Sequence, residues 1–560
     1  MDVAQPAQGS SRRRLALASS EVWFVVGVSL ILLLVTSAPT IYGYLATPPD
    51  RWFSGIVFNA HDTAQYLSWM RESGTAAFIE NRLTSEPNEA IYLNLHWWIP
   101  GRVARVLKLS LRQIYQVFRV FAVPLATAAI YLFCALLFTD RGRRRFAFLL
   151  VILTSGLGWV WVIQKYVTGA PDVLFPHDVY TTPGNTFWVM VASPHLTLAL
   201  ALTVCVLLLA FLGYHRQRFS LSVASGLVAL FLGWGHVYDL VTVWTVLAVF
   251  GALVTLRDGF RWRTFFGLFV VVLLSAPSAL YWAWVSSDVH PVWQEALAQY
   301  DNLGAFTPDP AHLVVLLGLT FLIALLTFDG LAPLKERSDR DLFVKSWFII
   351  VPLLIYLPLH FEIMLLTGYQ LPMGILATRG LYDHVLPWLR EHLPTRIASD
   401  RLLRAIPVLF LIAVSVTNLY ILAWRVLDLS RHDYPFYLHA DDEVALRWLE
   451  ENADPEDIVL SALETGHYVP GLSGTRPFLA NSVMTLDFNR KRALVQRFYS
   501  GGMTPEEQRA FLQEYGIRYL IWGPAERALG PFDLDEFGLF RQVFSSAQTR
   551  VYKLVLPQVP

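Results

Sequence analysis

The chain has 560 residues, of which 55% are hydrophobic and 16% are charged, and its 44 Lys and Arg residues balance its 44 Asp and Glu residues. A soluble domain has about 25% charged residues and would not reach the mean hydropathy of +0.44 found here. The composition therefore excludes a soluble globular protein, and the lack of a strongly basic stretch argues against nucleic acid as a partner. Cys134 and Cys205 lie in apolar runs and indicate neither a disulfide framework nor a metal site.

Long uncharged runs predict that most of the chain is a bundle of membrane helices. Residues 1–21 are expected to form a cytoplasmic tail, and the first run, Val22–Pro49, contains no charged residue. About 20 apolar residues span the core of a bilayer. Arg12–Arg14 before this run also fit a signal peptide, but the run is too long for one, so an uncleaved first helix is favoured. Comparable runs follow at Val120–Phe138, Phe146–Ile163, Met190–Tyr214, Phe219–Trp234, Leu240–Leu256, Phe265–Val285, Leu313–Phe328, Ser346–Phe361 and Ile406–Trp424.

One further run is weaker than the others. Leu371–Leu389 carries Arg379, Asp383 and His384, so the sequence leaves open whether it crosses the membrane as a short or broken helix. The prediction is an all-α polytopic membrane domain of about ten or eleven transmembrane helices over residues 22–425.

Basic residues in every second short loop predict the orientation of this bundle. Lys and Arg accumulate in the short loops on the cytoplasmic side of a membrane. The N-terminus is therefore expected inside, and everything after Trp424 outside if Leu371–Leu389 crosses. The basic clusters are Arg12–Arg14, Arg141–Arg145, His215–Arg218, Arg257–Arg263 and Lys335–Lys345.

The long first external loop, residues 48–112, is expected to contain two helices. The first covers His61–Gly74, and the second is an amphipathic stretch over Ile91–Lys108. Interfacial tryptophans followed by basic residues favour a second helix that lies flat on the membrane surface. The alternative is that this stretch extends the next membrane helix.

Residues 431–560 are predicted to form a small extracytoplasmic α/β domain. Asp441–Glu451 is expected to be a helix and Asp457–Ala462 a strand. A capping box at Thr504 opens a helix to Tyr515. Further strands are expected at Ile517–Trp522, Gln542–Phe544 and Arg550–Leu554, the last two as a hairpin.

Candidate chemistry centres on Asp62, at the start of the first helical stretch of the external loop. On a helix, Asp62, Gln65, Tyr66 and Trp69 share one face. A carboxylate beside hydrogen-bonding and aromatic groups could deprotonate a sugar hydroxyl and hold a sugar ring. Asp62 with Gln65 is also a capping-box pattern, and on spacing alone the simple role of starting the helix is favoured.

Other ionisable residues recur near the external ends of the membrane helices. His195 begins the fourth helix, and His236 with Asp239 lies in the turn between two short ones. A proton-coupled transporter would place such groups near the middle of the bilayer, whereas these are expected at its outer rim. No metalloprotease, nucleophile-elbow, Walker or CxxC motif is present in the sequence.

These features together resemble the GT-C superfamily of membrane glycosyltransferases. The best local match is Asp62-Thr63-Ala64-Gln65-Tyr66-Leu67, because that superfamily carries its catalytic aspartate early in the first external loop. Other stretches resemble a large group of mostly uncharacterised bacterial membrane proteins often grouped with GT-C enzymes. They are Ser155-Gly156-Leu157-Gly158-Trp159, Asn185-Thr186-Phe187, Pro194-His195, His236-Val237-Tyr238-Asp239, Gly516-Ile517-Arg518-Tyr519 and Gly523-Pro524.

The resemblance implies transfer of a sugar from a polyprenyl-phosphate carrier to an envelope glycan, lipid or protein on the outer face of a bacterial cytoplasmic membrane. Asp62 would be the general base. The sequence departs from the family because no second acid flanks Asp62. No cofactor is therefore certain, and the use of a divalent metal is left open. A flippase for lipid-linked sugars and a non-catalytic membrane protein with a glycan-binding domain are the alternatives. The substrate-binding candidates are His61, Gln65, Tyr66, Arg102, His195, His236 and Asp239.

Overall fold

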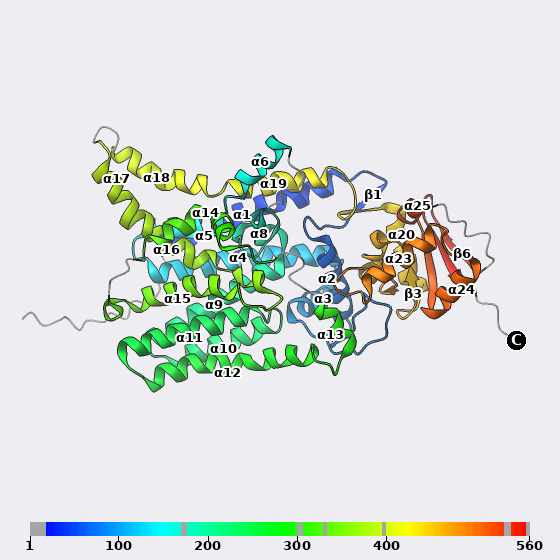
Figure 1. The fold of residues 1–560 in the computed structure, drawn as a ribbon, viewed down its shortest axis with the longest axis horizontal. Helices are drawn as coiled ribbons and strands as arrows, with labels where there is room; N and C mark the ends of the chain where they lie inside the picture. The colour runs from blue at the N-terminus through cyan, green and yellow to red at the C-terminus, as the bar shows by residue number, and fades with distance from the viewer. Residues whose placement is uncertain are drawn as a thin grey trace, which may run out of the picture.

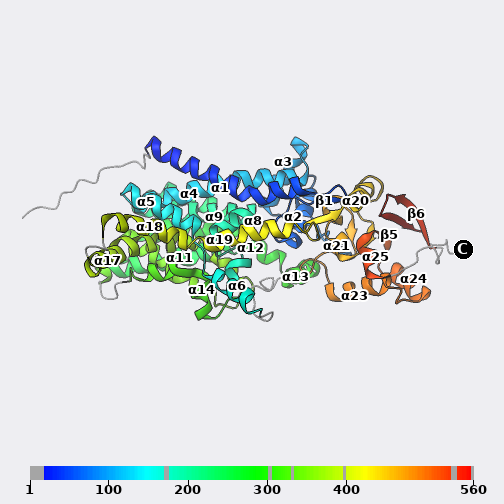
Figure 2. The ribbon, with the colours of Figure 1, turned by 90° about the horizontal axis from the view of Figure 1, so that it is seen from above.

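In the computed structural model, a long bundle of helices carries a small α/β domain at one end (Figure 1). The same arrangement is seen after a quarter turn, with α2 and α13 between the bundle and the domain (Figure 2). The structure describes residues 18–169, 176–299, 306–328, 333–394, 399–530 and 539–555.

The bundle confirms the prediction of a polytopic membrane domain. Within the described residues, seven helical stretches are long and apolar enough to cross a membrane, and shorter helices cover the remaining predicted runs. The helices of the bundle are α1 (Ser19–Ala46), α4 (Leu111–Leu137), α5 (Arg141–Leu153), α6 (Gly158–Thr168), α9 (Pro194–His215), α10 (Phe219–Gly233), α11 (Asp239–Asp258), α12 (Trp262–Val285), α14 (Pro310–Leu325), α15 (Asp339–Leu354), α16 (Gln370–Arg379), α17 (Leu386–His392), α18 (Asp400–Ala413) and α19 (Val416–Leu429).

The basic loops meet at the end of the bundle that lies away from the α/β domain, where α17 and the start of α18 are seen (Figure 1). Ion pairs join these loops to one another across long sequence separations. They are Arg143–Asp383, Arg144–Glu21, Arg257–Asp339 and Arg379–Asp341. The alternation read from the sequence thus corresponds to two chemically different ends of one bundle.

The weak run Leu371–Leu389 is one helical stretch with a change of pitch. The α-helix α16 continues through a π-helical segment, η4 (Gly380–Val385), into α17. A Cβ at Gly380 would lie 2.2 Å from the backbone oxygen of Ile323 in α14. Glycine is needed at this position because the two helix backbones touch there.

Three helices break at a common buried junction, which explains the Ser155–Trp159 motif. The backbone N–H of Ser155 donates to the carbonyl of Val414 between α18 and α19, at 2.7 Å. The N–H of Gly158 donates to the carboxylate of buried Asp178, at 2.9 Å. Gly318, with φ of 69°, interrupts α14 beside them. The backbone donors freed at the break between α5 and α6 are thereby satisfied by neighbouring segments, as an apolar surrounding requires.

The external loop contains two separate helices, α2 (Ala60–Ser73) and α3 (Leu95–Leu107). Lys108 takes a left-handed conformation between α3 and α4, so α3 does not extend the next membrane helix. The alternative is therefore wrong, and a helix lying flat on the membrane surface stays a prediction. Further short helices are α7 (His177–Tyr180), α8 (Thr186–Ala192), α13 (Pro291–Ala298), η2 (Leu334–Glu336) and η3 (Glu362–Leu366).

The C-terminal domain is the expected small α/β unit. Its sheet has the strand order β4-β3-β5-β7-β6, parallel from β4 to β5 and antiparallel beyond. The predicted capping box at Thr504 is present. The elements are β2 (Tyr437–His439), α20 (Ala440–Asn452), β3 (Ile458–Leu460), α21 (Leu463–Gly466), α22 (Val469–Leu472), β4 (Arg476–Pro477), α23 (Phe488–Tyr499), α24 (Pro505–Glu514), β5 (Ile517–Trp522), α25 (Pro524–Leu529), β6 (Phe540–Ser545) and β7 (Arg550–Leu554).

The domain is docked on the external loop by polar contacts. Strand β2 pairs with β1 (Arg51–Phe53) of the loop. Arg71 of α2 forms an ion pair with Glu450 at 2.7 Å, and buried Arg476 pairs with Glu80 and Glu456. The loop is thus held between the bundle and the domain.

We expect Gly158→Ala to destabilise the fold. The new Cβ would lie 2.0 Å from Oδ1 of Asp178, so the carboxylate must move and lose its backbone donor. Overpacking with an unsatisfied buried polar group costs about 2–4 kcal/mol. Gly27→Ala in α1 is the control, because no atom lies within 4 Å of its added Cβ. Equal thermal unfolding of the two purified variants would contradict the packing described.

Candidate functional site

Asp62 does not begin its helix, so the capping interpretation is wrong. Helix α2 starts at Ala60 after Asn59, whose φ of 45° is left-handed, and Asp62 is the third helical residue. Gln65 does not turn back to the helix start, since its Oε1 accepts a hydrogen bond from Asn481 at 3.1 Å. The helix begins earlier because the left-handed turn at Asn59 ends the preceding extended segment. The Asp62 carboxylate is therefore not occupied as a cap.

Asp62 lies in the wall of a cavity of about 520 Å³ at the domain end of the bundle. The cavity is formed jointly by the external loop, the bundle and Val483 and Met484 of the C-terminal domain. Of the predicted site residues, the structure brings five to this wall: Asp62, Gln65, Tyr66, His195 and His236.

The cavity is lined by aromatic rings and by small apolar residues. On the loop side the rings of Tyr66 and Trp97 stack with centroids 4.3 Å apart, and Trp69 lies 4.5 Å from Tyr92. These rings offer flat apolar faces. Trp282 of α12 joins these rings, with its ring centroid 5.2 Å from that of Tyr92. Helices α11 and α12 and the start of η3 also contribute small and apolar residues. Those residues are Val241, Ala279, Ala283 and Phe361.

Asp62 is half-buried, and its carboxylate accepts a hydrogen bond from Nδ2 of Asn59 at 2.6 Å. Loss of solvent raises the pKa of Asp62 to about 6, while the hydrogen bond from Asn59 acts in the opposite direction. An acid with this pKa is largely ionised at neutral pH and still basic enough to accept a proton.

Histidines occupy the side of the cavity that faces Asp62's helix from the bundle. The ring of His195 lies 4.7 Å from that of Tyr66 and 5.4 Å from that of His236. Nδ1 of His236 is 3.0 Å from Oδ2 of Asp239, and Nε2 is 3.0 Å from the hydroxyl of Tyr238. Asp239, a predicted binding residue, therefore lies behind His236 and is not itself in the wall.

Two predicted residues lie outside the cavity. Nδ1 of His61 is 2.8 Å from Nε2 of His467, so His61 contacts the C-terminal domain. Arg102 lies over the ring of Trp98 at 5.1 Å and donates to the carbonyl of Thr75 at 3.4 Å. Helix periodicity could not place either residue, because it does not show where the C-terminal domain or the loop after α2 would pack.

The sequence did not single out several residues that line the cavity. Asn94, Tyr92, Trp97 and Trp282 form much of its wall, and Tyr238 lies between two residues that were predicted. Tyr238 was within a quoted motif, His236–Asp239, so the signal was present there. His96 lies behind the wall, and its burial beside His236 lowers its pKa to about 3, so it is neutral at physiological pH.

The charge of the cavity is unusual for a site that would hold phosphate. No Lys or Arg is found among the described residues of its wall, and Asp62 is the one carboxylate there. Within the described part of the chain, no group of three His, Cys, Asp or Glu residues is placed to hold a metal ion.

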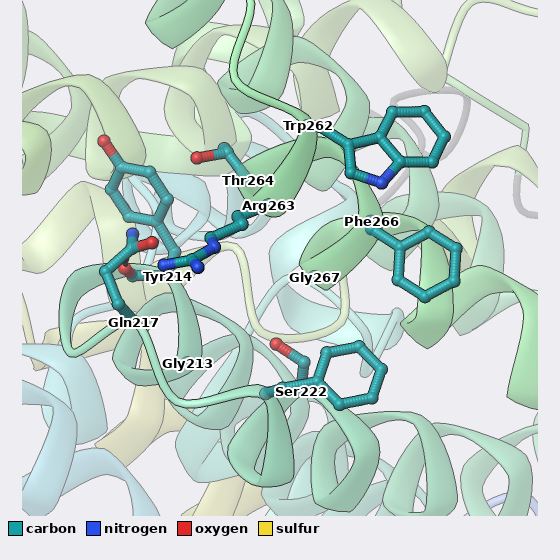
Figure 3. Close-up of a pocket in the computed structure, with 10 residues that line it drawn as sticks. Gly213, Tyr214, Gln217, Ser222, Trp262, Arg263, Thr264, Phe266 and Gly267 are labelled. Atoms are coloured by element: carbon teal, nitrogen blue, oxygen red, sulfur yellow. Dashed lines mark hydrogen bonds between the residues drawn. The ribbon is translucent and has the colours of Figure 1, made fainter.

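A second cavity, of about 360 Å³, lies at the basic end of the bundle between α9, α10 and α12. Figure 3 shows Arg263 extending beside Tyr214 and Gln217, with the rings of Trp262 and Phe266 to one side. No acid or histidine is among its described wall residues. It therefore offers no general base.

Solved structures of other proteins share the fold of this chain. No protein-family model and no curated protein sequence matches this chain. The oligosaccharyltransferase of Archaeoglobus fulgidus in its apo form superposes with a TM-score of 0.51, at 12% identity over 97% of this chain and 76% of its own. Its complex with an inhibitory peptide and a dolichol-phosphate gives 0.50, at 13% identity over 97% and 75%.

A further structure, ArnT from Cupriavidus metallidurans bound to undecaprenyl phosphate, is 14% identical over 97% of this chain and 99% of its own. Its TM-score of 0.49 is too low to support an inference. This chain therefore shares the overall fold of that oligosaccharyltransferase, and the architecture expected from the resemblance is confirmed as a fold.

We expect a carboxyl group that titrates near pH 6 to be assignable to Asp62. The infrared C=O band of a protonated carboxyl should appear as the pH falls through this value. Other buried acids remain in Asp62→Asn, so the difference between wild type and the variant isolates this group. A difference band with a midpoint near the ordinary aspartate value, about 4, would show that the cavity does not desolvate Asp62.

Proposed function

We propose that this chain is a membrane glycosyltransferase that moves a sugar from a polyprenyl-phosphate carrier to a hydroxyl of an envelope glycan, lipid or protein. The observation that carries the proposal is Asp62 in the wall of a cavity that is lined by aromatic rings and by apolar residues of the membrane helices. Rings can stack on a sugar, and the apolar residues suit the carrier chain. The oligosaccharyltransferase of similar fold has been seen with a dolichol-phosphate, which supports a lipid-linked donor.

Asp62 acts as the general base in this proposal. Its carboxylate takes the proton of the acceptor hydroxyl while the hydroxyl oxygen attacks the anomeric carbon of the donor sugar. The bond from that carbon to the phosphate oxygen breaks, and the carrier phosphate leaves. Gln65 and Tyr66 lie beside the base on α2, where they can orient the acceptor.

The leaving phosphate gains a negative charge that must be stabilised. Arg102 lies outside the cavity, so it does not have the role expected from the sequence. His195 and His236 line the cavity, and His195 is placed to donate a hydrogen bond instead, since both ring nitrogens of His236 contact Asp239 and Tyr238. The carrier phosphate is therefore expected to lie beside His195 and His236.

The proposed location is the bacterial cytoplasmic membrane, with the cavity and the C-terminal domain on its outer face. The support is the segregation of basic loops to the opposite end of the bundle. A flippase or a non-catalytic glycan-binding protein would not need an acid of raised pKa at the junction of loop, bundle and domain.

We expect Asp62→Asn to lose sugar transfer by on the order of a hundredfold to ten-thousandfold, because general-base catalysis contributes about this much. The amide oxygen can still accept from Asn59, so folding should be preserved. The assay follows label transfer from polyprenyl-phosphoryl sugars to membrane glycans in reconstituted vesicles.

The matched control is Asp50→Asn, an exposed acid of the same loop that lies outside the cavity. It should transfer sugar at the wild-type rate. Wild-type turnover by Asp62→Asn would remove the base assignment. Movement of lipid-linked sugar across the bilayer by a wild-type protein that transfers nothing would establish the flippase alternative.

We expect the two ends of the bundle to be labelled from opposite sides of the membrane. Ala547→Cys lies in the exposed turn between β6 and β7, and Arg141→Cys in the exposed start of α5. A membrane-impermeant maleimide should label the first but not the second in intact cells. The native Cys134 is buried and Cys205 lies within the bundle, so background labelling should be low. The reverse pattern would place the cavity inside.

A further inference from the structure

A chain of three side chains leads from the protein interior to the proposed site. Asp239 and His236 are 1% and 3% exposed, and Tyr238 is in the cavity wall. The carboxylate Oδ2 is 3.0 Å from Nδ1 of the imidazole, and Nε2 is 3.0 Å from the tyrosine hydroxyl. Both imidazole nitrogens thus have a partner. Nδ1 contacts the buried Asp239, and Nε2 contacts Tyr238 in the cavity wall.

The turn between α10 and α11 is fixed by its neighbours, so this chain is held in place. Nδ2 of Asn94 donates to the carbonyl of Gly235 at 3.0 Å, and Nε1 of Trp282 donates to that of Gly233 at 2.9 Å. A Cβ at Gly235 would lie 2.2 Å from the ring of His96. The backbone therefore passes so close to α3 that only glycine fits.

We propose that Tyr238, linked to His236 and Asp239, is the proton donor to the carrier phosphate as it leaves; this inference rests on the proposed function. Tyr238 would touch the phosphate and act as a catalytic residue, with His236 as the source of the proton. Asp239 would be a positioning residue that keeps the imidazole oriented.

The linked side chains of Asp239, His236 and Tyr238 can adopt two states that differ by one proton. With a neutral imidazole, the Tyr238 hydroxyl donates to Nε2, and Nδ1–H donates to Asp239. With an imidazolium, Nε2–H donates to the tyrosine oxygen, and the tyrosine proton can point into the cavity. An anionic phosphate in the cavity stabilises the second state through its positive charge.

The bond from the anomeric carbon to the phosphate oxygen breaks, and its electron pair stays on that oxygen. The oxygen takes the hydroxyl proton of Tyr238, and the tyrosine oxygen takes the proton of Nε2. The products are a singly charged carrier phosphate and a neutral imidazole, while the acceptor's proton is on Asp62. Exchange with water restores both groups.

The surroundings make the linked side chains of Asp239, His236 and Tyr238 the source of positive charge in the cavity. The titratable groups around His236 are Tyr238 and Asp239 in its own segment, His96 on α3 and His195 on α9, with Asp62 across the cavity. No Lys or Arg is among the described wall residues, so no permanent cation competes with the imidazolium.

The test is binding of methyl undecaprenyl phosphate, a phosphodiester whose charge is constant from pH 5 to pH 9, measured by quenching of tryptophan fluorescence of the full-length protein. Wild type should bind more tightly at low pH, because an imidazolium at His236 and a protonated Asp62 across the cavity both favour the anion. Tyr238→Phe keeps the ring against Phe361 and should bind roughly tenfold more weakly, with the pH dependence reduced. Asp239→Asn should shift the pH at which binding changes.

The control is Tyr356→Phe, which removes a hydroxyl that donates to the carbonyl of Pro308 outside the cavity. It should bind like wild type. Tyr238→Phe with wild-type affinity and pH dependence would overturn the proton-donor assignment. Because this readout needs no turnover, a wild type that binds as described but transfers no sugar would refute the proposed function and leave the phosphate contact of Tyr238 supported.

In a wild type that does transfer sugar, kcat of Tyr238→Phe should fall on the order of a hundredfold or more, and the decline of kcat at high pH should disappear. Asp62→Asn should instead remove the rise of kcat near pH 6. A fall in rate with the high-pH decline unchanged would make Tyr238 a packing residue and overturn the inference.

Discussion

The packing of one helix, α2, between the membrane bundle and the C-terminal domain is the constraint on which the site depends. Tyr66 stacks on Trp97 on one side of this helix, while Gln65 and Arg71 contact Asn481 and Glu450 of the domain on the other. A helix held on both sides cannot rotate. Asp62, in its first turn, is therefore fixed at the junction of loop, bundle and domain, where solvent is reduced and the cavity lies.

Desolvation gives this junction its chemistry. The same loss of water that raises the pKa of Asp62 to about 6 strengthens the hydrogen bonds of the chain Asp239–His236–Tyr238. One side of the cavity can accept a proton and the other can supply one. A site with no Lys or Arg among its described wall residues would make phosphate binding conditional on protonation, whereas a guanidinium would bind phosphate at any pH.

The apolar runs, the alternation of basic loops and the capping box at Thr504 could be read from the sequence because they are local signals. The break between α5 and α6 could not, because its cause is a carboxylate at Asp178 and a carbonyl at Val414, far away in the sequence. The start of α2 was placed one residue late, at His61, since Asn59 uses a left-handed turn in place of a side-chain cap. Spacing brought Asp62, Gln65 and Tyr66 together correctly, but it could not show that Asn94 and Trp282 would complete the cavity.

An electron cryomicroscopy structure with a non-transferable polyprenyl-phosphoryl sugar tests the central claim most directly. We expect the phosphate to lie against Tyr238 and His236, the carrier to run along the apolar residues of α11 and α12, and the anomeric carbon to face Asp62. A carrier phosphate bound instead at the basic end, in the cavity beside Arg263, with the Asp62 cavity empty, would contradict it.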